Sequence, residues 1–147
     1  KLFSFHINNK MKKSFNHKIK VYYEDTDAGG VVYYANYLKF LERARSEALS
    51  EVGLSNLKIK KDYGALIVVK SCNIDFNRSA HLEDKLRINS FVTSFSKTSF
   101  TMSQSIYRKK NNIVKSKVHL VFVNEKSKPI KIPENILKNL KPFLFIN

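Results

Sequence analysis

Residues 21–47 read VYYEDTDAGGVVYYANYLKFLERARSE, and this stretch decides both the fold and the chemistry expected of the chain. Acidic residues are followed by the adjacent glycines Gly29 and Gly30, and then by apolar side chains at helical spacing. Glycine permits tight turns and close approach of a ligand, while a helix N-terminus offers free N–H groups and a partial positive charge. The stretch can therefore hold a carboxylate beside oxyanion donors, which is the minimum equipment for acyl transfer.

The apolar spacing predicts one long helix over residues 36–52. The stripe covers about half of the helix circumference at 3.6 residues per turn, so we expect deep burial. Asn36 is the expected N-cap and Gly53 the expected C′ residue. Arg45 falls within the apolar arc, where an unpaired charge is very costly. We therefore expect an acidic partner for Arg45, and we favour an ion pair with Arg45 or a structural role for Glu42 over a catalytic one.

Five strand-like segments and a short C-terminal helix complete the pattern. Pro133 is expected to open that helix, over residues 134–140, as its first residue. Short connections between the last four strands favour antiparallel neighbours. The order predicts an α+β fold, with an antiparallel five-stranded sheet wrapped around one long helix. The edges of a single sheet also favour a dimer. The predicted strands cover residues 17–24, 65–76, 85–95, 99–108 and 113–123.

The length of 147 residues suits one compact domain. We expect residues 1–16 to form a flexible N-terminal extension and residues 17–147 a single domain, since MKKSFN from Met11 resembles a translation start. No apolar run is long enough to span a bilayer, so we expect no stable membrane insertion and a cytoplasmic location.

The composition is strongly basic, with 27 Lys and Arg against 12 Asp and Glu and a formal net charge of +15. Such a charge attracts polyanions, but the excess of Lys together with abundant Asn, Ile and Phe is typical of AT-rich coding sequence. We therefore favour codon bias and a modest anion site over nucleic-acid binding. The single cysteine, Cys72, cannot form an internal disulfide. The four His show no metal-ligand spacing, so no metal site is expected.

The missing signatures also narrow the reaction class. Ser-His-Asp, Cys-His and metal motifs are absent from the pattern, which argues against conventional hydrolases. A thioester is different, because its thiolate leaves from a thiol with a pKa of about 8.5 and needs little acid assistance. One carboxylate, acting as nucleophile or as base on a water, together with one or two amide donors could suffice.

The pattern D-x-D-x-G-G-V-V-Y-x-x-N-Y-x-x-F-x-E-R-A-R within residues 21–47 resembles the signature of the 4-hydroxybenzoyl-CoA thioesterase family of the hotdog superfamily. It is most similar to the bacterial acyl-CoA thioesterases associated with the Tol-Pal system. A weaker similarity continues through DFNRSAHLEDKLRI to about residue 123. The resemblance implies a hotdog fold, hydrolysis of a small or medium acyl-CoA, and homodimers or homotetramers with coenzyme A bound near a subunit interface. Coenzyme A is part of the substrate, so no separate cofactor is implied.

The same resemblance implies the site residues. Asp27 takes the place of the catalytic carboxylate, and the backbone amide of Tyr34 that of the group polarising the thioester carbonyl. Members of the family usually carry His where this chain has Tyr34, a change that leaves the amide in place. Gly29, Gly30 and Tyr33 are expected to contact substrate. Arg78 is a candidate for the phosphates of coenzyme A.

Three other functions remain open from the sequence. A hotdog protein could bind acyl-CoA or acyl-carrier protein without turnover. A dehydratase of the wider superfamily would usually need a histidine-bearing site, and His17 and His81 have no supporting context. A nucleic-acid-binding module is suggested by charge alone, because the chain has no recognisable motif for it.

Overall fold

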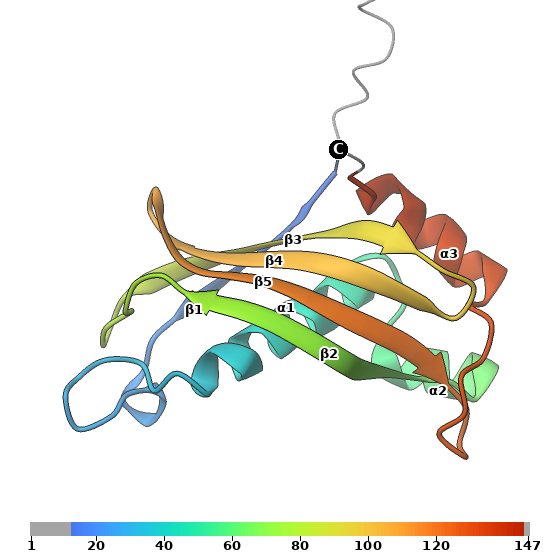
Figure 1. Ribbon diagram of the computed structural model, residues 1–147, viewed down its shortest axis with the longest axis horizontal. Helices are drawn as coiled ribbons and strands as arrows, with labels where there is room; N and C mark the ends of the chain where they lie inside the picture. Colours follow the sequence, from blue (N-terminus) through green and yellow to red (C-terminus); the bar gives the residue numbers. More distant parts are fainter. Residues whose placement is uncertain (1–12, 146–147) are drawn as a thin grey trace, which may run out of the picture.

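The computed structural model describes residues 13–145. Its centre is one antiparallel five-stranded sheet in the order β1-β3-β4-β5-β2. The long helix α1 lies across one face of this sheet, with the shorter helices α2 and α3 at one end and the loop that precedes α1 at the other (Figure 1). The predicted α+β class, and the five-stranded sheet around one long helix, are confirmed.

The bounds of the elements agree with the predicted ones to within a few residues, apart from one helix. The strands are β1 Phe15–Lys20, β2 Leu66–Phe76, β3 Lys85–Phe95, β4 Ser99–Arg108 and β5 Asn111–Val123; the helices are α1 Asn36–Glu51, α2 Asn56–Tyr63 and α3 Glu134–Leu140. Pro133 is the N-cap of α3 rather than its first residue. Among the described residues, no helix is both long enough and apolar enough to cross a bilayer.

The first strand begins and ends earlier than the alternation predicts. Phe15 is buried and stacks on Phe143 with ring centroids 3.7 Å apart, so residues 15 and 16 belong to β1 and not to the predicted extension. Residues 1–12 of that extension lie outside the described part of the chain. After Lys20 the chain leaves the sheet and forms a 3-10 turn, Tyr23–Asp25, because the Asp25 carboxylate accepts the Tyr22 N–H at 2.9 Å.

The ends of α1 are set by different groups from those expected. Asn36 is the first helical residue and not the N-cap, since its side-chain amide donates to the carbonyl of Asp25 at 2.9 Å. This bond joins the start of α1 to the turn that precedes it. Gly53 does take the C′ position, with φ +77°, and the N–H of Leu54 closes back on the Leu49 carbonyl at 2.8 Å.

Helix α2 was not predicted, and it carries Lys58, Lys60 and Lys61. These lysines are exposed, and the helix has a cap at each end. The Ser55 hydroxyl accepts the Lys58 N–H at 3.2 Å, and Gly64 ends the helix with φ +61°. A single buried side chain, Ile59, anchors it to the core. So small an apolar face leaves almost no periodic signal in the sequence.

The core lies between α1 and the inner face of the sheet. Five apolar side chains of α1 are at most 3% exposed: Tyr37, Phe40, Leu41, Ala44 and Ala48. The facing side chains come from alternate positions of the strands, as the period of a strand requires. The inner-face residues of β4, for example, are Phe100, Met102, Gln104 and Ile106.

Gln104 is a fully buried polar residue in this core. Its amide nitrogen donates to the Leu41 carbonyl at 3.1 Å and to the Ser90 hydroxyl at 3.0 Å, while its amide oxygen accepts from Arg45 at 2.9 Å. The prediction of an acidic partner for Arg45 is therefore wrong, because a neutral amide receives the guanidinium. Burial lowers the pKa of Arg45, and the nearby charge of Glu42 acts in the opposite direction.

We expect Gln104→Leu to lower the free energy of unfolding by about 3 kcal/mol, because it leaves the Arg45 guanidinium and the Leu41 carbonyl without this partner. Urea unfolding followed by circular dichroism measures the loss. Ser103→Ala, on the outer face of the same strand, is the matched control and should change stability by less than about 0.5 kcal/mol. Equal stabilities of wild type and Gln104→Leu would contradict the role of this amide.

Candidate active site

Asp27 lies on a narrow hairpin that leads directly into α1. The hairpin is closed by backbone bonds from the N–H of Asp27 to the carbonyl of Val31 at 2.9 Å and from the N–H of Tyr33 to that of Asp25 at 3.0 Å. Thr26 and Val32 form an isolated antiparallel bridge between these bonds. The last of these bonds is made by Tyr33, and α1 begins three residues later at Asn36.

The two glycines shape the tip of this hairpin. The Asp27 carboxylate accepts the N–H of Gly29 at 2.8 Å, and a Cβ at Gly29 would lie 3.2 Å from that same carboxylate oxygen. Gly30 has φ +78°, a conformation that residues with a side chain rarely adopt. Both glycines therefore hold the turn that presents Asp27, whose side chain is exposed to solvent.

The backbone before α1 also offers an amide donor. Among the described residues, the N–H of Tyr34 has no hydrogen-bond partner, whereas those of Tyr33 and Asn36 are bonded to Asp25 and Tyr33. A free N–H at the mouth of a helix carries partial positive charge and can stabilise an oxyanion. The Tyr34 ring is 61% exposed and packs edge-on against Phe76 of β2 at 5.8 Å between centroids.

A second segment, residues 78–84, holds the hairpin from the side. The Ala80 carbonyl accepts the N–H of Val32 at 2.8 Å, and the Gly30 carbonyl accepts the N–H of Leu82 at 3.3 Å. This segment is itself fixed by Asp84. Its carboxylate pairs with the Arg108 guanidinium at 2.6 Å and accepts the N–H of His81 at 2.8 Å.

Sequence reasoning gave no role to Asp84 or Arg108. They are 24 positions apart, on the turn before β3 and at the end of β4, so no local pattern joins them. Partial burial raises the pKa of Asp84, but the hydrogen bonds from His81 and Arg108 and the charge of Arg108 together leave the pKa below its ordinary value. Asp84 is therefore ionised at neutral pH and supports the Asp27 hairpin.

Arg78, the candidate for coenzyme A phosphates, points elsewhere. Its guanidinium donates to the side chain of Asn111 at 3.1 Å, at the start of β5. The structure thus ties Arg78 to the β4–β5 turn and records no bond between it and the hairpin in the described part of the chain.

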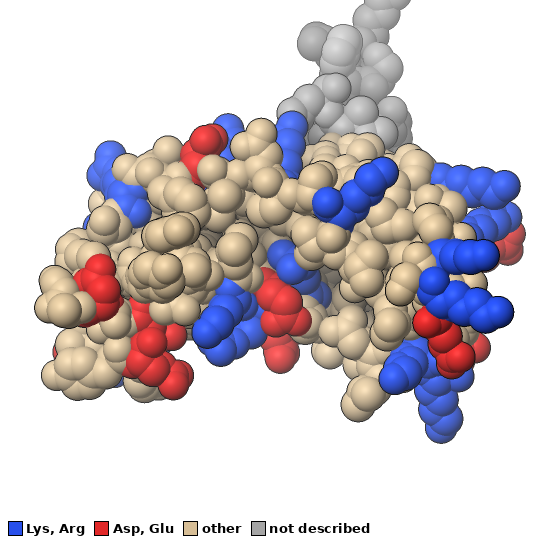
Figure 2. Space-filling view, turned by 60° about the horizontal axis from the view of Figure 1, so that its bottom comes forward, with Lys and Arg blue, Asp and Glu red and all other residues tan. Residues whose placement is uncertain are grey.

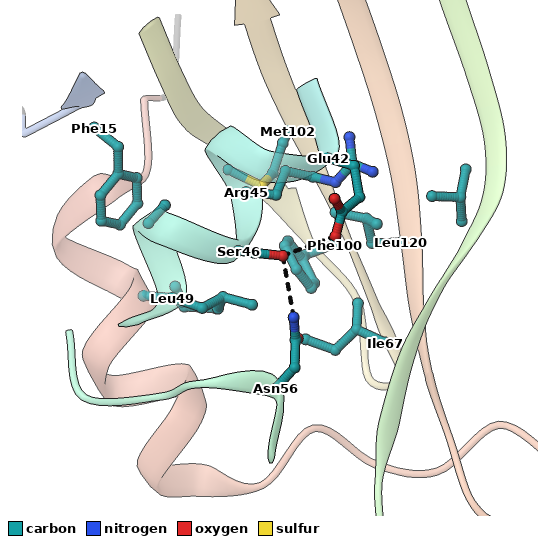
Figure 3. Close-up of a pocket in the computed structure, with 13 residues that line it drawn as sticks. Phe15, Glu42, Arg45, Ser46, Leu49, Asn56, Ile67, Phe100, Met102 and Leu120 are labelled. Carbon is teal, nitrogen blue, oxygen red and sulfur yellow. Dashed lines mark hydrogen bonds between the residues drawn. The ribbon is translucent and has the colours of Figure 1, made fainter. Parts of the chain in front are cut away.

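A cavity of about 130 Å³ lies between α1 and the sheet, and Asp27 is not among its lining residues. One face of α1 between residues 42 and 49 forms its roof, and side chains of β2, β4 and β5 line it from the sheet side (Figure 3). At 1.5 Å rise per residue, Ser46 is about 15 Å along α1 from Asn36. Within one chain the carboxylate and the cavity are therefore well separated.

Polar side chains cross one wall of this cavity. Asn56 donates to the Ser46 hydroxyl at 3.1 Å, and Ser46 donates to the Glu42 carboxylate at 2.9 Å (Figure 3). Glu42 thus bonds to Ser46, and the described residues show no ion pair between Glu42 and Arg45. In the described part of the chain, no group of three or more His, Cys, Asp or Glu is placed to hold a metal ion.

Comparison with known proteins decides the family. The family model of the thioesterase-like superfamily matches residues 21–140, which include the hairpin, α1 and the whole of β2 to β5. The chain belongs to the thioesterase-like superfamily. Among members with curated descriptions, the acyl-CoA thioester hydrolase YbgC of Escherichia coli is 37% identical over 129 residues, covering 86% of this chain and 96% of that protein. The acyl-CoA thioesterase YbgC of Helicobacter pylori is 35% identical over 127 residues, covering 80% and 92%.

Solved structures agree with this membership of the superfamily. A probable thioesterase from Bartonella henselae superposes with a TM-score of 0.80 at 33% identity, covering 82% of this chain and all of that one. A variant of 4-hydroxybenzoyl-CoA thioesterase superposes with a TM-score of 0.82 at 21% identity, over 87% and 99% of the two chains, which supports the shared fold. The predicted resemblance and hotdog fold are confirmed.

Asp84→Asn should remove part of the acid sensitivity of the fold. Because the folded-state pKa of Asp84 is depressed, its contribution to stability is present above the unfolded pKa of about 3.9 and is lost as pH falls through the folded value. The variant should be less stable than wild type at pH 7, and the difference should shrink below about pH 4. Thermal unfolding across that range measures it. The exposed Asp62→Asn should follow the wild-type profile, and a pH-independent difference would contradict this role.

Proposed function

We propose that this protein is an acyl-CoA thioesterase in which Asp27 is the essential carboxylate and the Tyr34 amide binds the oxyanion. The hairpin carries the proposal, because it holds an exposed carboxylate just before a helix start whose Tyr34 N–H is free. The curated relatives that are described as acyl-CoA thioesterases align with nearly their whole length. The protein is thus a hydrolase of thioester bonds, and its acyl-CoA would be small or medium in size.

Two routes through Asp27 are compatible with this arrangement. The carboxylate can attack the carbonyl carbon, expelling the coenzyme A thiolate and leaving a mixed anhydride that water hydrolyses. Alternatively it can take a proton from a water that attacks the same carbon. In both routes the negative charge on the carbonyl oxygen is met by the Tyr34 N–H. Gly29, Gly30 and Tyr33 would shape the substrate contacts, and Arg78 would meet a phosphate only if substrate drew it away from Asn111.

Asp27→Asn should lower kcat/KM for acyl-CoA hydrolysis at least about 100-fold, because an amide is neither a nucleophile nor a base here. Thiol release from a panel of acyl-CoAs measures it. Asp62→Asn makes the same chemical change on the exposed face of α2 and should leave the rate within about twofold of wild type. Full activity of Asp27→Asn would end the assignment, and acyl-CoA binding without turnover by wild type would favour the non-catalytic binding protein.

We further propose that two copies pair through β2. This strand is an edge of the sheet, yet it exposes large apolar side chains: Leu66, Val68, Val69 and Phe76. An uncovered edge with apolar residues favours pairing with another strand. A second copy can supply that strand by twofold symmetry, in which the two β2 strands run antiparallel about their centre near Ser71.

Charge distribution supports the same pairing. Acidic side chains gather at the end of the molecule that carries the hairpin, and basic ones predominate at the opposite end, where α2 lies (Figure 2). Helix α2 carries Lys58, Lys60 and Lys61, whereas the 3-10 turn carries Glu24 and the hairpin after it carries Asp27. An antiparallel dimer brings the acidic end of one copy toward the basic end of the other, which favours this orientation over a parallel one.

The native Cys72 tests this pairing. It is exposed near the centre of β2, so two copies of it should lie close together across the twofold axis. A short bismaleimide should link the two Cys72 thiols and give a covalent dimer. The reaction is run at mildly alkaline pH because burial raises the pKa of this thiol more than the charge of Arg45 lowers it. Cys72→Ser should give none. A monomer by sedimentation velocity, or a dimer that resists this linkage, would contradict pairing through β2.

Two further expectations belong to the proposal. The resemblance to the thioesterases associated with the Tol-Pal system suggests a functional link to that envelope machinery. A cytoplasmic location would give the enzyme access to acyl-CoA, and immunodetection in cell fractions tests it.

A further inference from the structure

The cavity under α1 is graded from polar to apolar. Glu42 and Asn56 on one wall are exposed, as is Val69 on the edge strand, so the cavity opens on the β2 side. Its deeper wall is built from side chains that are at most 4% exposed: Phe15, Ala48, Phe100, Met102, Leu120 and Leu140.

The strand order gives the cavity a direction. Its lining side chains come from β2, β5, β4 and β1. From the β2 edge, the strands of the sheet follow one another in this same order, apart from β3, which contributes no lining side chain. Phe15 on β1 therefore lies at the closed end, farthest from the opening at β2. Phe143 stacks on the Phe15 ring without lining the cavity.

We propose that this cavity takes the acyl group of the substrate, that the acyl group is apolar with about four to six carbons, and that Phe15 sets its length. The inference rests on the proposed function and adds the substrate class to it. In the paired arrangement, the attacking carboxylate is Asp27 of the partner subunit.

The position of the carboxylate follows from β2 pairing. Within one chain, the rings of Tyr34 and Tyr37 each lie 5.8 Å from that of Phe76, so the hairpin end of the molecule is at the C-terminal end of β2. The cavity opens beside Ile67 and Val69, at the N-terminal end of the same strand. Antiparallel pairing of two β2 strands places these opposite ends side by side, and does so twice in each dimer.

The size of the cavity limits the acyl group. A cavity of about 150 Å³ accommodates benzene, so 130 Å³ accepts a group of similar bulk. Each methylene that enters should gain about 0.8 kcal/mol, or roughly fourfold in affinity, until the chain reaches the closed end. Longer chains should gain nothing more, because Phe15 and its stacked partner block the way.

The deep wall disfavours a hydroxyl at the far end of an aromatic acyl group. The six side chains that form it carry no hydroxyl, amide or charged group. A phenol hydroxyl buried against them would lose its water without gaining a partner. Benzoyl should therefore be preferred over 4-hydroxybenzoyl by about 10- to 100-fold in affinity.

The test measures the affinity of non-hydrolysable acyl-CoA thioethers, from acetyl to decanoyl, by calorimetry on the full chain. Wild-type affinity should rise about fourfold per carbon and level off near hexanoyl. Phe15→Leu should move that break to longer chains by one or two carbons. Phe143→Leu, which disturbs the same stack outside the cavity, should leave it in place. Ala48→Val fills the cavity and should move the break to shorter chains, so the inference can be tested even if Phe15→Leu does not fold.

Thiol release from the matching acyl-CoAs separates this inference from the proposed function. If affinity levels off with chain length but no acyl-CoA is hydrolysed, the acyl pocket is supported and the proposed thioesterase activity is rejected. Two outcomes would overturn the acyl pocket while leaving the proposed thioesterase activity in place. One is hydrolysis with affinities that do not depend on chain length. The other is a break in chain-length dependence that stays in place in both Phe15→Leu and Ala48→Val.

Discussion

The apolar stripe of α1 must be covered, and a single five-stranded sheet covers it unevenly. Toward β1 and β3 the cover is complete, and Phe40, Leu41 and Ala44 are at most 2% exposed. Toward β2 the sheet ends in an edge strand whose apolar side chains remain exposed, and there the space between helix and sheet opens into a cavity. The exposed apolar edge strand and the cavity thus have one cause, which is that the sheet ends at β2 before it covers this side of α1. A second copy of the sheet would correct both at once.

This constraint also explains why the carboxylate can be so exposed in one chain. Asp27 is on a hairpin outside the core, held by its own turn, by the Asp25 backbone and by the segment that Asp84 and Arg108 fix. Val32 anchors this hairpin to the buried cluster beneath α1, and the N–H of Ala80 in the supporting segment donates to the Tyr37 hydroxyl of α1 at 2.9 Å. The buried Gln104 network stabilises the middle of α1 independently.

Much of this architecture follows from local patterns. The alternation within β3, β4 and β5 and the half-circumference stripe of α1 are strong periodic signals, and the bounds of β3 and β4 agree with the prediction to the residue. Short elements with few buried side chains escape such reasoning, as α2 shows. Long-range polar pairing escapes it too. Arg45 finds a neutral amide 59 positions away, and Asp84 finds Arg108 on another strand. The motif indicates Asp27 and the Tyr34 amide as the reacting groups. It does not indicate which side chains, or which of the two copies, would contact the acyl group of the substrate.

Tyr34 shows how one residue can carry two separable roles. Its amide is backbone, so the proposed oxyanion contact does not depend on the side chain that replaces the usual histidine. Its ring instead packs against Phe76, at the end of the edge strand through which we propose that the copies pair. A phenol ring gives more apolar contact there than an imidazole. The substitution therefore adds a ring contact between the hairpin end of the molecule and the edge strand. The negative charge on the reacting carbonyl oxygen would then be met by a backbone N–H, while Asp27 acts as nucleophile or base, which suffices for a leaving group as weakly basic as a thiolate.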